Sequence, residues 1–214
     1  MDIMEIIKSR HSVRQYEDKP IEAYKRDKIN LFVKNINDES GLNIQVFYDE
    51  PECFSSPKAH YGKFSNVGNY FSIVGKKEDQ EKCGYYGEKL VLMCQGIGLN
   101  TCWVALTHGK SKAVIEKGQK ELIIISLGYG KTQGIPRKSK GISELSCADE
   151  KVDWFEKGME AVALAPTAIN QQKFFFELKD GKVYAKSLGG LYSNIDLGIA
   201  KYHFEAVTGH VVEY

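Results

Sequence analysis

The sequence has almost no net charge, no long apolar run and no regular cysteine pattern. Its 214 residues include 29 basic and 28 acidic side chains, which leaves a formal net charge of +1. Nucleic-acid binders that neutralise phosphates need a basic excess, so this balance argues against that class. No apolar run approaches the roughly 20 residues of a membrane-spanning helix, so we also expect no membrane partner.

Signatures of metal sites and hydrolases are missing as well. The five histidines form no His-Glu-x-x-His pattern, and the sequence contains no Gly-x-Ser-x-Gly elbow. It therefore indicates neither a metal centre nor a serine hydrolase. The five cysteines include no Cys-x-x-Cys pair. An odd set of thiols without such pairs is typical of a reducing compartment, so we expect a cytoplasmic protein.

The hydrophobic pattern predicts a mixture of helices and strands. Apolar residues at helical spacing predict helices over 3–10, 21–33, 85–97, 151–164 and 195–207. Short apolar runs predict strands over 42–48, 70–74, 122–127, 174–178, 183–185 and 211–214. Asp180 and Gly181 separate two of these strands, which is a hairpin signal. The order lacks a steady βαβ rhythm, so the sequence predicts a single α+β domain over residues 1–214.

A faint internal repeat accompanies this pattern. Gly87 and Gly198 each lie near the start of a predicted helix, and each precedes a closing glycine, Gly98 or Gly209, by the same spacing. Two pseudo-symmetric half-domains with a boundary near residues 140–150 would produce this repeat. The ordinary alternative is that many helices end in glycine.

The first candidate site is the segment 10–16, Arg-His-Ser-Val-Arg-Gln-Tyr, which follows a predicted helix. If it is extended, Arg10, Ser12 and Arg14 point to one side. Guanidinium forks and a hydroxyl together suit a phosphate. A solvated basic turn beside the negative end of a helix dipole would explain the same residues.

The second candidate is the segment 165–172, Ala-Pro-Thr-Ala-Ile-Asn-Gln-Gln, between a helix and a strand. The amides of Asn170 and Gln172 each offer a donor and an acceptor, which match a heterocycle edge that carries C=O and N–H side by side. A polar loop with an Asx-type turn explains these residues equally simply.

A third segment, 128–132, ends like a phosphate-binding P-loop. The motif requires an earlier glycine where Ile125 stands, and Pro136 prevents the helix that should follow the lysine. Nucleotide hydrolysis is therefore a poor interpretation. The same loop brings Arg137, Lys138 and Lys140 together in sequence, either as extra positive charge for a phosphate or as a solvated basic run.

Taken together, these segments resemble the nitroreductase family of FMN-dependent oxidoreductases. Segment 10–16 resembles the family's Arg-Arg-Ser-Val-Arg-x-Phe motif, and segment 165–172 its Ala-Pro-Ser-x-x-Asn-x-Gln-Pro-Trp motif. Residues 195–200 resemble its Asp-x-Gly-x-Ala helix, 96–103 its Leu-Gly-Leu-x-(small)-x-Trp segment, and 127–129 its Leu-Gly-Tyr strand end. The second motif comes late in this chain, as in a rearranged branch with duplicated halves, and Lys173 and Phe174 replace its Pro and Trp.

The resemblance implies a mainly antiparallel sheet flanked by helices, an FMN cofactor and a homodimer. It assigns the FMN phosphate and ribityl chain to Arg10, His11, Ser12 and Arg14, with help from Arg137 or Lys138. Asn170 and Gln172 would contact the pyrimidine edge, and the backbone at Ala105 and Leu106 would meet flavin N5. NAD(P)H would give hydride to N5, and a nitroaromatic, quinone or similar flat acceptor would receive it. No side chain need act as a catalytic acid or base.

A different class of function remains open from the sequence. An FMN carrier or sensor would need the same phosphate and ring contacts but would show no turnover. Reduction by NADH or NADPH separates the two hypotheses.

Overall fold

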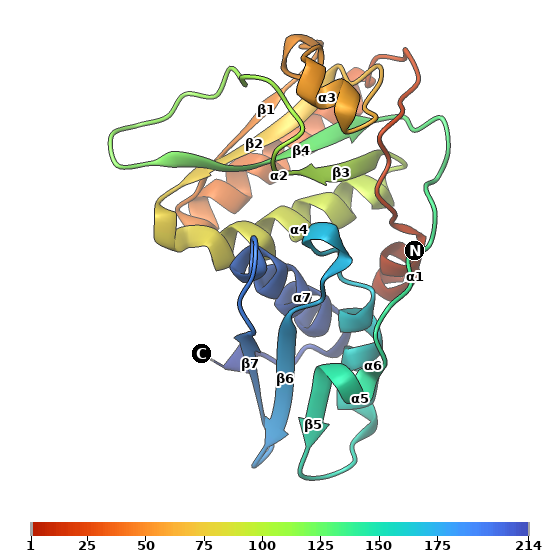
Figure 1. Ribbon diagram of the computed structural model, residues 1–214, viewed down its shortest axis with the longest axis vertical. Coiled ribbons are helices and arrows are strands. Elements are labelled where there is room, and N and C mark those ends of the chain that lie inside the picture. The colour runs from red at the N-terminus through yellow and green to blue at the C-terminus, as the bar shows by residue number, and fades with distance from the viewer. Residues whose placement is uncertain (1, 214) are drawn as a thin grey trace. The chain divides into compact units, whose positions relative to one another are not determined.

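The computed structural model describes residues 2–213 and divides the chain into two compact units (Figure 1). The larger unit comprises residues 9–79 and 90–136. The smaller unit comprises residues 2–8, 80–89 and 137–213. The helices α1 (Ile3–Ser9) and α4 (Gln80–Gly96) each supply residues to both units. No helix in the described part of the chain is long and apolar enough to cross a membrane.

The larger unit is built on a four-stranded antiparallel sheet in the order β1-β2-β4-β3. Its strands are β1 (Asn43–Phe47), β2 (Asn69–Gly75), β3 (Asn100–Val104) and β4 (Lys120–Gly128). Every residue of β2 and the last seven of β4 are buried. The continuous apolar run at 122–127 therefore marks an inner strand, as the sequence predicts.

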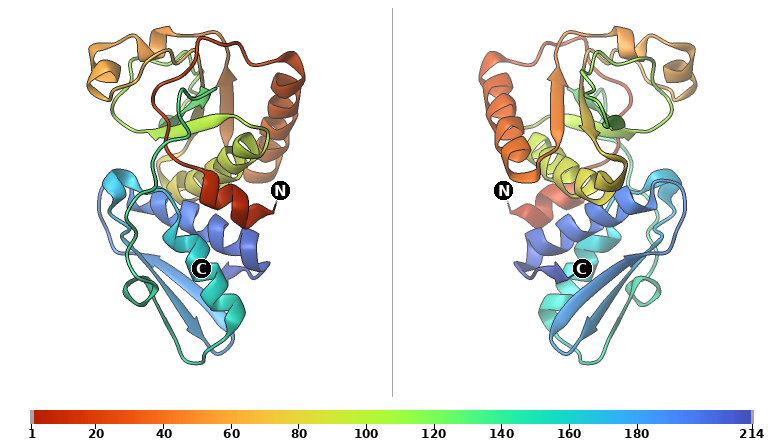
Figure 2. Two further views of the ribbon diagram at one scale, coloured as in Figure 1. Left: turned by 90° about the vertical axis from the view of Figure 1, so that its right-hand side faces the viewer. Right: turned by 90° about the vertical axis from the view of Figure 1, so that its left-hand side faces the viewer.

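Helices cover both faces of this sheet. Figure 2 shows α2 (Ala23–Ser40) and α3 (Pro57–Tyr61) on opposite sides of it. The helix α2 runs seven residues beyond the predicted end at residue 33, because Ile36 continues its buried stripe. It ends where Gly41, at φ 71°, donates its N–H to the Asn37 carbonyl. Glycine adopts this left-handed conformation at little cost, which terminates the helix.

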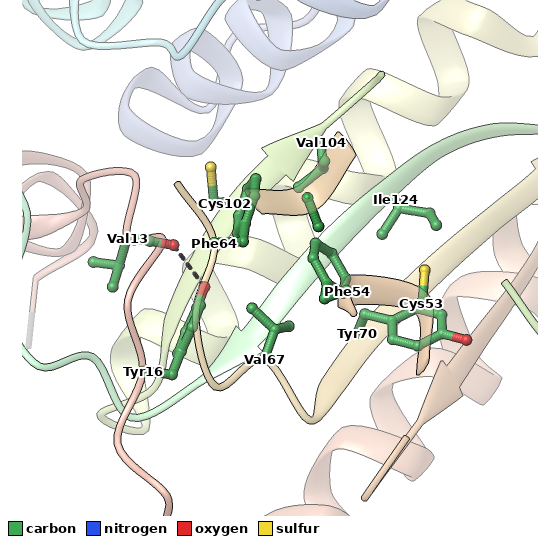
Figure 3. Close-up of a cluster of buried hydrophobic side chains, with 11 residues drawn as sticks. Val13, Tyr16, Cys53, Phe54, Phe64, Val67, Tyr70, Cys102, Val104 and Ile124 are labelled. Atoms are coloured by element: carbon green, nitrogen blue, oxygen red, sulfur yellow. Dashed lines mark hydrogen bonds between the residues drawn. The ribbon is translucent and has the colours of Figure 1, made fainter. Parts of the chain in front are cut away.

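A cluster of buried apolar side chains fills the α3 side of the larger unit. Its centre is aromatic: the rings of Phe54 and Phe64 lie 5.1 Å apart, and those of Phe54 and Tyr70 lie 6.0 Å apart. Figure 3 shows this cluster, which includes Val13 and Tyr16. Burying a side chain such as that of Val13 stabilises its position by about 1.5–3 kcal/mol. The segment 10–16 is thereby fastened to the core.

The smaller unit has a mixed sheet in the order β5-β6-β7-β8. Its strands are β5 (Ser146–Ala148), β6 (Phe174–Lys179), β7 (Lys182–Ser187) and β8 (Val212–Glu213). The pairs β5–β6 and β7–β8 are parallel, and β6–β7 is antiparallel. The predicted hairpin turn is present, because Asp180 and Gly181 have φ values of 52° and 71°, as a type I′ turn requires. Residue 214 of the predicted last strand lies outside the described residues.

The helices α6 (Asp153–Ala163) and α7 (Ser193–Thr208) pack on one face of this sheet, beside the short α5 (Ile142–Leu145) (Figures 1 and 2). Along β6 the side chains alternate, with Phe174, Phe176 and Leu178 buried toward the helices. The other face carries the more exposed residues of the strand. The predicted α+β class, with sheets flanked by helices, is confirmed.

Two glycines allow α4 and α7 to cross at backbone contact within the smaller unit. A Cβ atom at Gly84 would overlap the carbonyl oxygen of Ile195. A Cβ atom at Gly198 would overlap the carbonyl oxygen of Glu81 and lie 2.7 Å from the amide nitrogen of Tyr85. The contact is reciprocal, with each helix presenting a glycine to the other's backbone.

We expect Gly198→Ala to destabilise the protein by about 2 kcal/mol or more, because backbone cannot move aside as a flexible side chain can. The loss should appear although alanine gains roughly 1 kcal/mol of helix propensity over glycine. Urea denaturation measures it. Gly68→Ala is the control, since a Cβ atom there meets nothing within 4 Å. Equal stability of the two variants would contradict the close crossing.

Candidate functional site

The segment 10–16 is extended and is held by backbone hydrogen bonds on two sides. The Val13 N–H donates to the Thr101 carbonyl on β3 at 3.0 Å, in a parallel bridge. On the other side, Tyr16 donates to the Ser65 carbonyl at 3.1 Å, and Ser65 donates to the Arg14 carbonyl at 3.0 Å. In a segment that is extended in this way, successive side chains point to opposite sides, as predicted from the sequence.

The alternation brings Arg10, Ser12 and Arg14 to the same thiol. All three side chains interact with Cys102 on β3: Ser12 by a hydrogen bond and the two arginines by charge. Burial raises the pKa of the Cys102 thiol above its ordinary value, while Arg14, Ser12 and Arg10 lower it. The two guanidiniums and the hydroxyl therefore all act on the Cys102 thiol, as alternation along an extended segment allows.

The three donors differ in their access to solvent. Arg14 is exposed and Ser12 is half-buried, whereas Arg10 is only 1% exposed. The guanidinium of Arg14 also lies 6.0 Å from the centre of the Phe64 ring. Ser12 and Arg14 can meet an anion that arrives from solution, while Arg10 adds positive charge from beneath them.

Tyr16, the last residue of the segment, is buried. Its hydroxyl donates to the Val13 carbonyl at 2.7 Å (Figure 3). The same hydroxyl lies 2.8 Å from the Ser126 hydroxyl. Burial is the main cause that raises the pKa of Tyr16 well above its ordinary value. The phenol therefore stays neutral and serves the packing of the segment.

The glycines of the P-loop-like stretch serve close packing. A Cβ atom at Gly134, which has φ 79°, would lie 2.6 Å from the Cβ of His11. A Cβ atom at Gly130 would lie 2.8 Å from a methyl group of Val13. No helix follows Lys131 before α5. These glycines let the loop 128–134 lie against segment 10–16, and the half-buried His11 is covered by it.

Ala105 and Leu106 follow the end of β3 in the larger unit, where the chain lines a cavity of about 650 Å³. Leu106 is 63% exposed, and Ala105 is half-buried. The α3 residues that line the cavity are Pro57 and Lys58, next to the helix cap Ser56. A small molecule fits a cavity of this size.

In the smaller unit, the segment 137–140 contacts the end of α6. The Arg137 guanidinium donates to the Leu164 carbonyl, and the Ser139 hydroxyl donates to the Ala163 carbonyl at 2.7 Å. The last carbonyls of a helix lack partners within the helix, and cations favour this negative end of the dipole. Arg137 therefore caps α6, a role that the sequence analysis did not assign. Lys138 is exposed, and its carbonyl accepts a hydrogen bond from Asn170 at 2.8 Å.

Asn170 and Gln172 lie in one loop but have different surroundings. Gln172 is 1% exposed; its Nε2 donates to the Ala163 carbonyl at 3.1 Å, and its Oε1 accepts from the Lys140 N–H at 2.8 Å. Both ends of the amide thus bind this chain's own backbone. These two bonds fix Gln172 within the loop, and its contact with a ring stays a prediction. Asn170 is exposed and donates through Nδ2.

The loop that carries Asn170 has a strained backbone. Ile169, Asn170 and Gln172 have φ values of 47°, 55° and 44°. For a β-branched residue such as Ile169 this conformation is rare and costs of the order of 1–3 kcal/mol. Ile169 is nevertheless 86% exposed. Strain that persists in an exposed loop indicates a constraint other than local packing.

Asp196 near the start of α7 fixes this loop. Its Oδ1 accepts from the Ala168 N–H at 2.9 Å, and its Oδ2 accepts from Gln171 Nε2 at 2.7 Å. The same Gln171 nitrogen donates to the Leu191 carbonyl at 2.7 Å. In the sequence, Asp196 stands out only as part of the Asp-x-Gly-x-Ala stretch. Its capacity to accept two hydrogen bonds was the available signal, but the partners lie 25 and 28 residues away.

Burial raises the pKa of Asp196 from 3.8 to about 6, although the hydrogen bonds from Gln171 and Ala168 lower it. A carboxyl whose pKa is higher when folded binds its proton more tightly in the folded state. Its contribution to stability is therefore favourable below about pH 4 and is lost as the pH rises to about 6.

We expect the free energy of unfolding of the wild type to fall by about 2–3 kcal/mol more than that of Asp196→Asn between pH 4 and pH 6.5. Urea denaturation of both proteins across this range measures the difference, in which titrations common to both cancel. A difference that does not vary with pH would contradict the buried state of this carboxyl.

With this geometry established, comparison with known proteins identifies the family. The family model described as "Putative TM nitroreductase" matches residues 2–208. The chain therefore belongs to this nitroreductase family, as the motif resemblance predicted, and so to the oxidoreductases. No curated protein matches the sequence.

Two solved structures illustrate the shared fold. A putative nitroreductase from Thermotoga maritima superposes with a TM-score of 0.69 at 24% identity and covers 97% of this chain and 83% of its own. A putative NADH dehydrogenase/NAD(P)H nitroreductase from Bacteroides thetaiotaomicron has a TM-score of 0.51 at 18% identity, covering 67% of this chain and 95% of its own. At these identities the likeness concerns the fold.

Proposed function

We propose that the protein is an FMN-dependent oxidoreductase that takes hydride from NAD(P)H and reduces a small flat acceptor such as a nitroaromatic or a quinone. The observation that carries this proposal is the cluster of Arg10, Ser12 and Arg14 on one side of an anchored, extended segment. Family membership supports the same conclusion. The flavin supplies the hydride chemistry when bound, and the chain's residues hold and orient it.

The donor set of segment 10–16 fits the terminal phosphate of FMN. Guanidinium–phosphate and hydroxyl–phosphate hydrogen bonds are charge-assisted and among the strong ones. Ser12 and Arg14 would bind the phosphate, and the buried Arg10 would hold positive charge below it. The segment carries one compact anion site and no Gly-x-Gly-x-x-Gly fingerprint for a pyrophosphate. We therefore assign FMN rather than FAD.

The residues of the smaller unit have separate proposed roles. Asn170, exposed and bearing an amide, is the residue we assign to the polar edge of the flavin ring. Gln172 and Asp196 position the loop that carries it. Arg137 caps α6, so Lys138 is the better candidate of the two for added charge near a phosphate. A homodimer in the cytoplasm remains part of the proposal on the strength of the resemblance.

We expect Arg14→Gln to weaken FMN binding about tenfold or more, because a hydrogen bond to a charged group contributes about 1.5–3 kcal/mol. Titration of apoprotein with FMN, followed by flavin fluorescence, measures the affinity. Lys28→Gln removes one exposed charge from α2 and is the control. Unchanged affinity in Arg14→Gln, or tighter binding of FAD than of FMN by the wild type, would refute the phosphate assignment.

We expect Asn170→Gly to lower both the FMN affinity and the flavin midpoint potential. Glycine tolerates φ 55°, so this change removes the amide and keeps the backbone. A donor aimed at the ring edge favours the reduced flavin, whose negative charge develops there. A dye-coupled redox titration of flavin-saturated protein measures the potential. Asp180→Gly, at φ 52°, is the matched control, and values equal to wild type in Asn170→Gly would remove Asn170 from the site.

A further inference from the structure

The cavity of about 650 Å³ beside β3 in the larger unit lies between two chain segments. One wall is the loop after β3, with Ala105 and Leu106, and the other is the start of α3. The Gly109 N–H donates to the Cys53 carbonyl at 2.6 Å, which ties the loop to the segment before α3. A Cβ atom at Gly109 would lie 3.1 Å from that carbonyl and 3.3 Å from the Cβ of Ser56. The two walls are therefore held together by close backbone contact.

The lining of this cavity combines an apolar surface with positive charge. Pro57, Ala105 and Leu106 supply apolar atoms, whereas Lys58 and Lys110 supply two exposed ammonium groups. Among the residues that line it in the described structure, none is acidic. An apolar wall accepts a ring, and free ammonium groups favour a negative substituent on that ring.

Two acidic residues before α3 form ion pairs with another lysine, Lys112. Glu50 and Glu52 lie 3.6 Å and 3.1 Å from the ammonium group of Lys112. Within the described residues, Lys58 and Lys110 form no ion pair. Their charge is therefore available to a ligand.

We propose that this cavity binds a flat ring that carries an anionic group, so that the enzyme prefers anionic over neutral partners. The inference rests on the proposed function and on the contact between flavin N5 and the backbone at Ala105 and Leu106 that the family resemblance implies. It specifies the class of molecule that enters next to the flavin. The carboxylate of an acceptor and the phosphate of a nicotinamide nucleotide share this chemistry. Lys58 and Lys110 are the residues that determine the preference.

Direct binding to the flavin-free protein tests the cavity independently of turnover. Calorimetric titration with 4-nitrobenzoate and with neutral 4-nitrobenzamide examines the acceptor, and titration with nicotinamide mononucleotide and nicotinamide riboside examines the nucleotide. We expect the anionic member of at least one pair to bind roughly threefold to tenfold more tightly at low salt, because each exposed ion pair contributes modestly. The preference should shrink as salt is added.

The double variant Lys58→Gln/Lys110→Gln should lose this preference and keep its affinity for the neutral compounds. Lys117→Gln, which removes an exposed charge outside the cavity lining, should keep it. All three lysines are exposed, and a circular dichroism melt verifies folding. Equal binding of anionic and neutral members in both pairs, or a preference that survives the double variant, would overturn the proposal.

Turnover by the FMN-loaded protein separates this inference from the proposed function. If the loaded enzyme reduces the two nitro compounds but the protein binds the anionic and neutral members of both pairs equally, the proposed function stands and the inference fails. If the protein shows no reduction of either compound but the apoprotein still prefers the anions through the two lysines, the cavity assignment stands and the proposed function fails.

Discussion

A chain segment that runs extended outside a sheet must satisfy its backbone hydrogen bonds elsewhere, and segment 10–17 does so against three neighbours. The carbonyls of Thr101 on β3 and Tyr129 after β4 accept backbone hydrogen bonds from it, and Ser65 after α3 both accepts and donates. Buried backbone groups without partners are costly, so these bonds decide the path of the segment. The side-chain alternation then follows, with Val13 and Tyr16 in the core and the cationic side chains beside Cys102.

The glycine-rich loop after β4 is explained by the same constraint. Backbone can approach segment 10–16 closely only where the facing residue lacks a side chain, and Gly130 and Gly134 provide those positions. The glycines of the stretch 128–134, part of which ends like a P-loop, thus serve close packing. The crossing of α4 and α7 in the smaller unit depends on glycine for the same physical reason.

The longer helices, most of the strands and the hairpin turn could be predicted from the sequence, because each depends on local periodicity or local turn chemistry; the short α3, α5 and β5 were not predicted. The strand order β1-β2-β4-β3 could not be predicted, since it depends on contacts between distant residues. In the candidate site, too, some features follow from the local sequence and others from distant contacts. The shared face of Arg10, Ser12 and Arg14 follows from a period of two residues. Which amide of the loop 165–172 is buried depends instead on Lys140 and Ala163, 32 and 9 residues from Gln172.

We propose that this nitroreductase-family chain binds FMN and cycles it between a nicotinamide donor and a flat acceptor. Anaerobic mixing of the FMN-saturated protein with NADH or NADPH, followed by addition of 4-nitrobenzamide, tests both half-reactions in one absorbance trace. We expect the absorbance of oxidised flavin to disappear when the nicotinamide is added and to return when the acceptor is added. A flavin that stays bound and oxidised in the presence of both nicotinamides would contradict it and would indicate an FMN carrier or sensor.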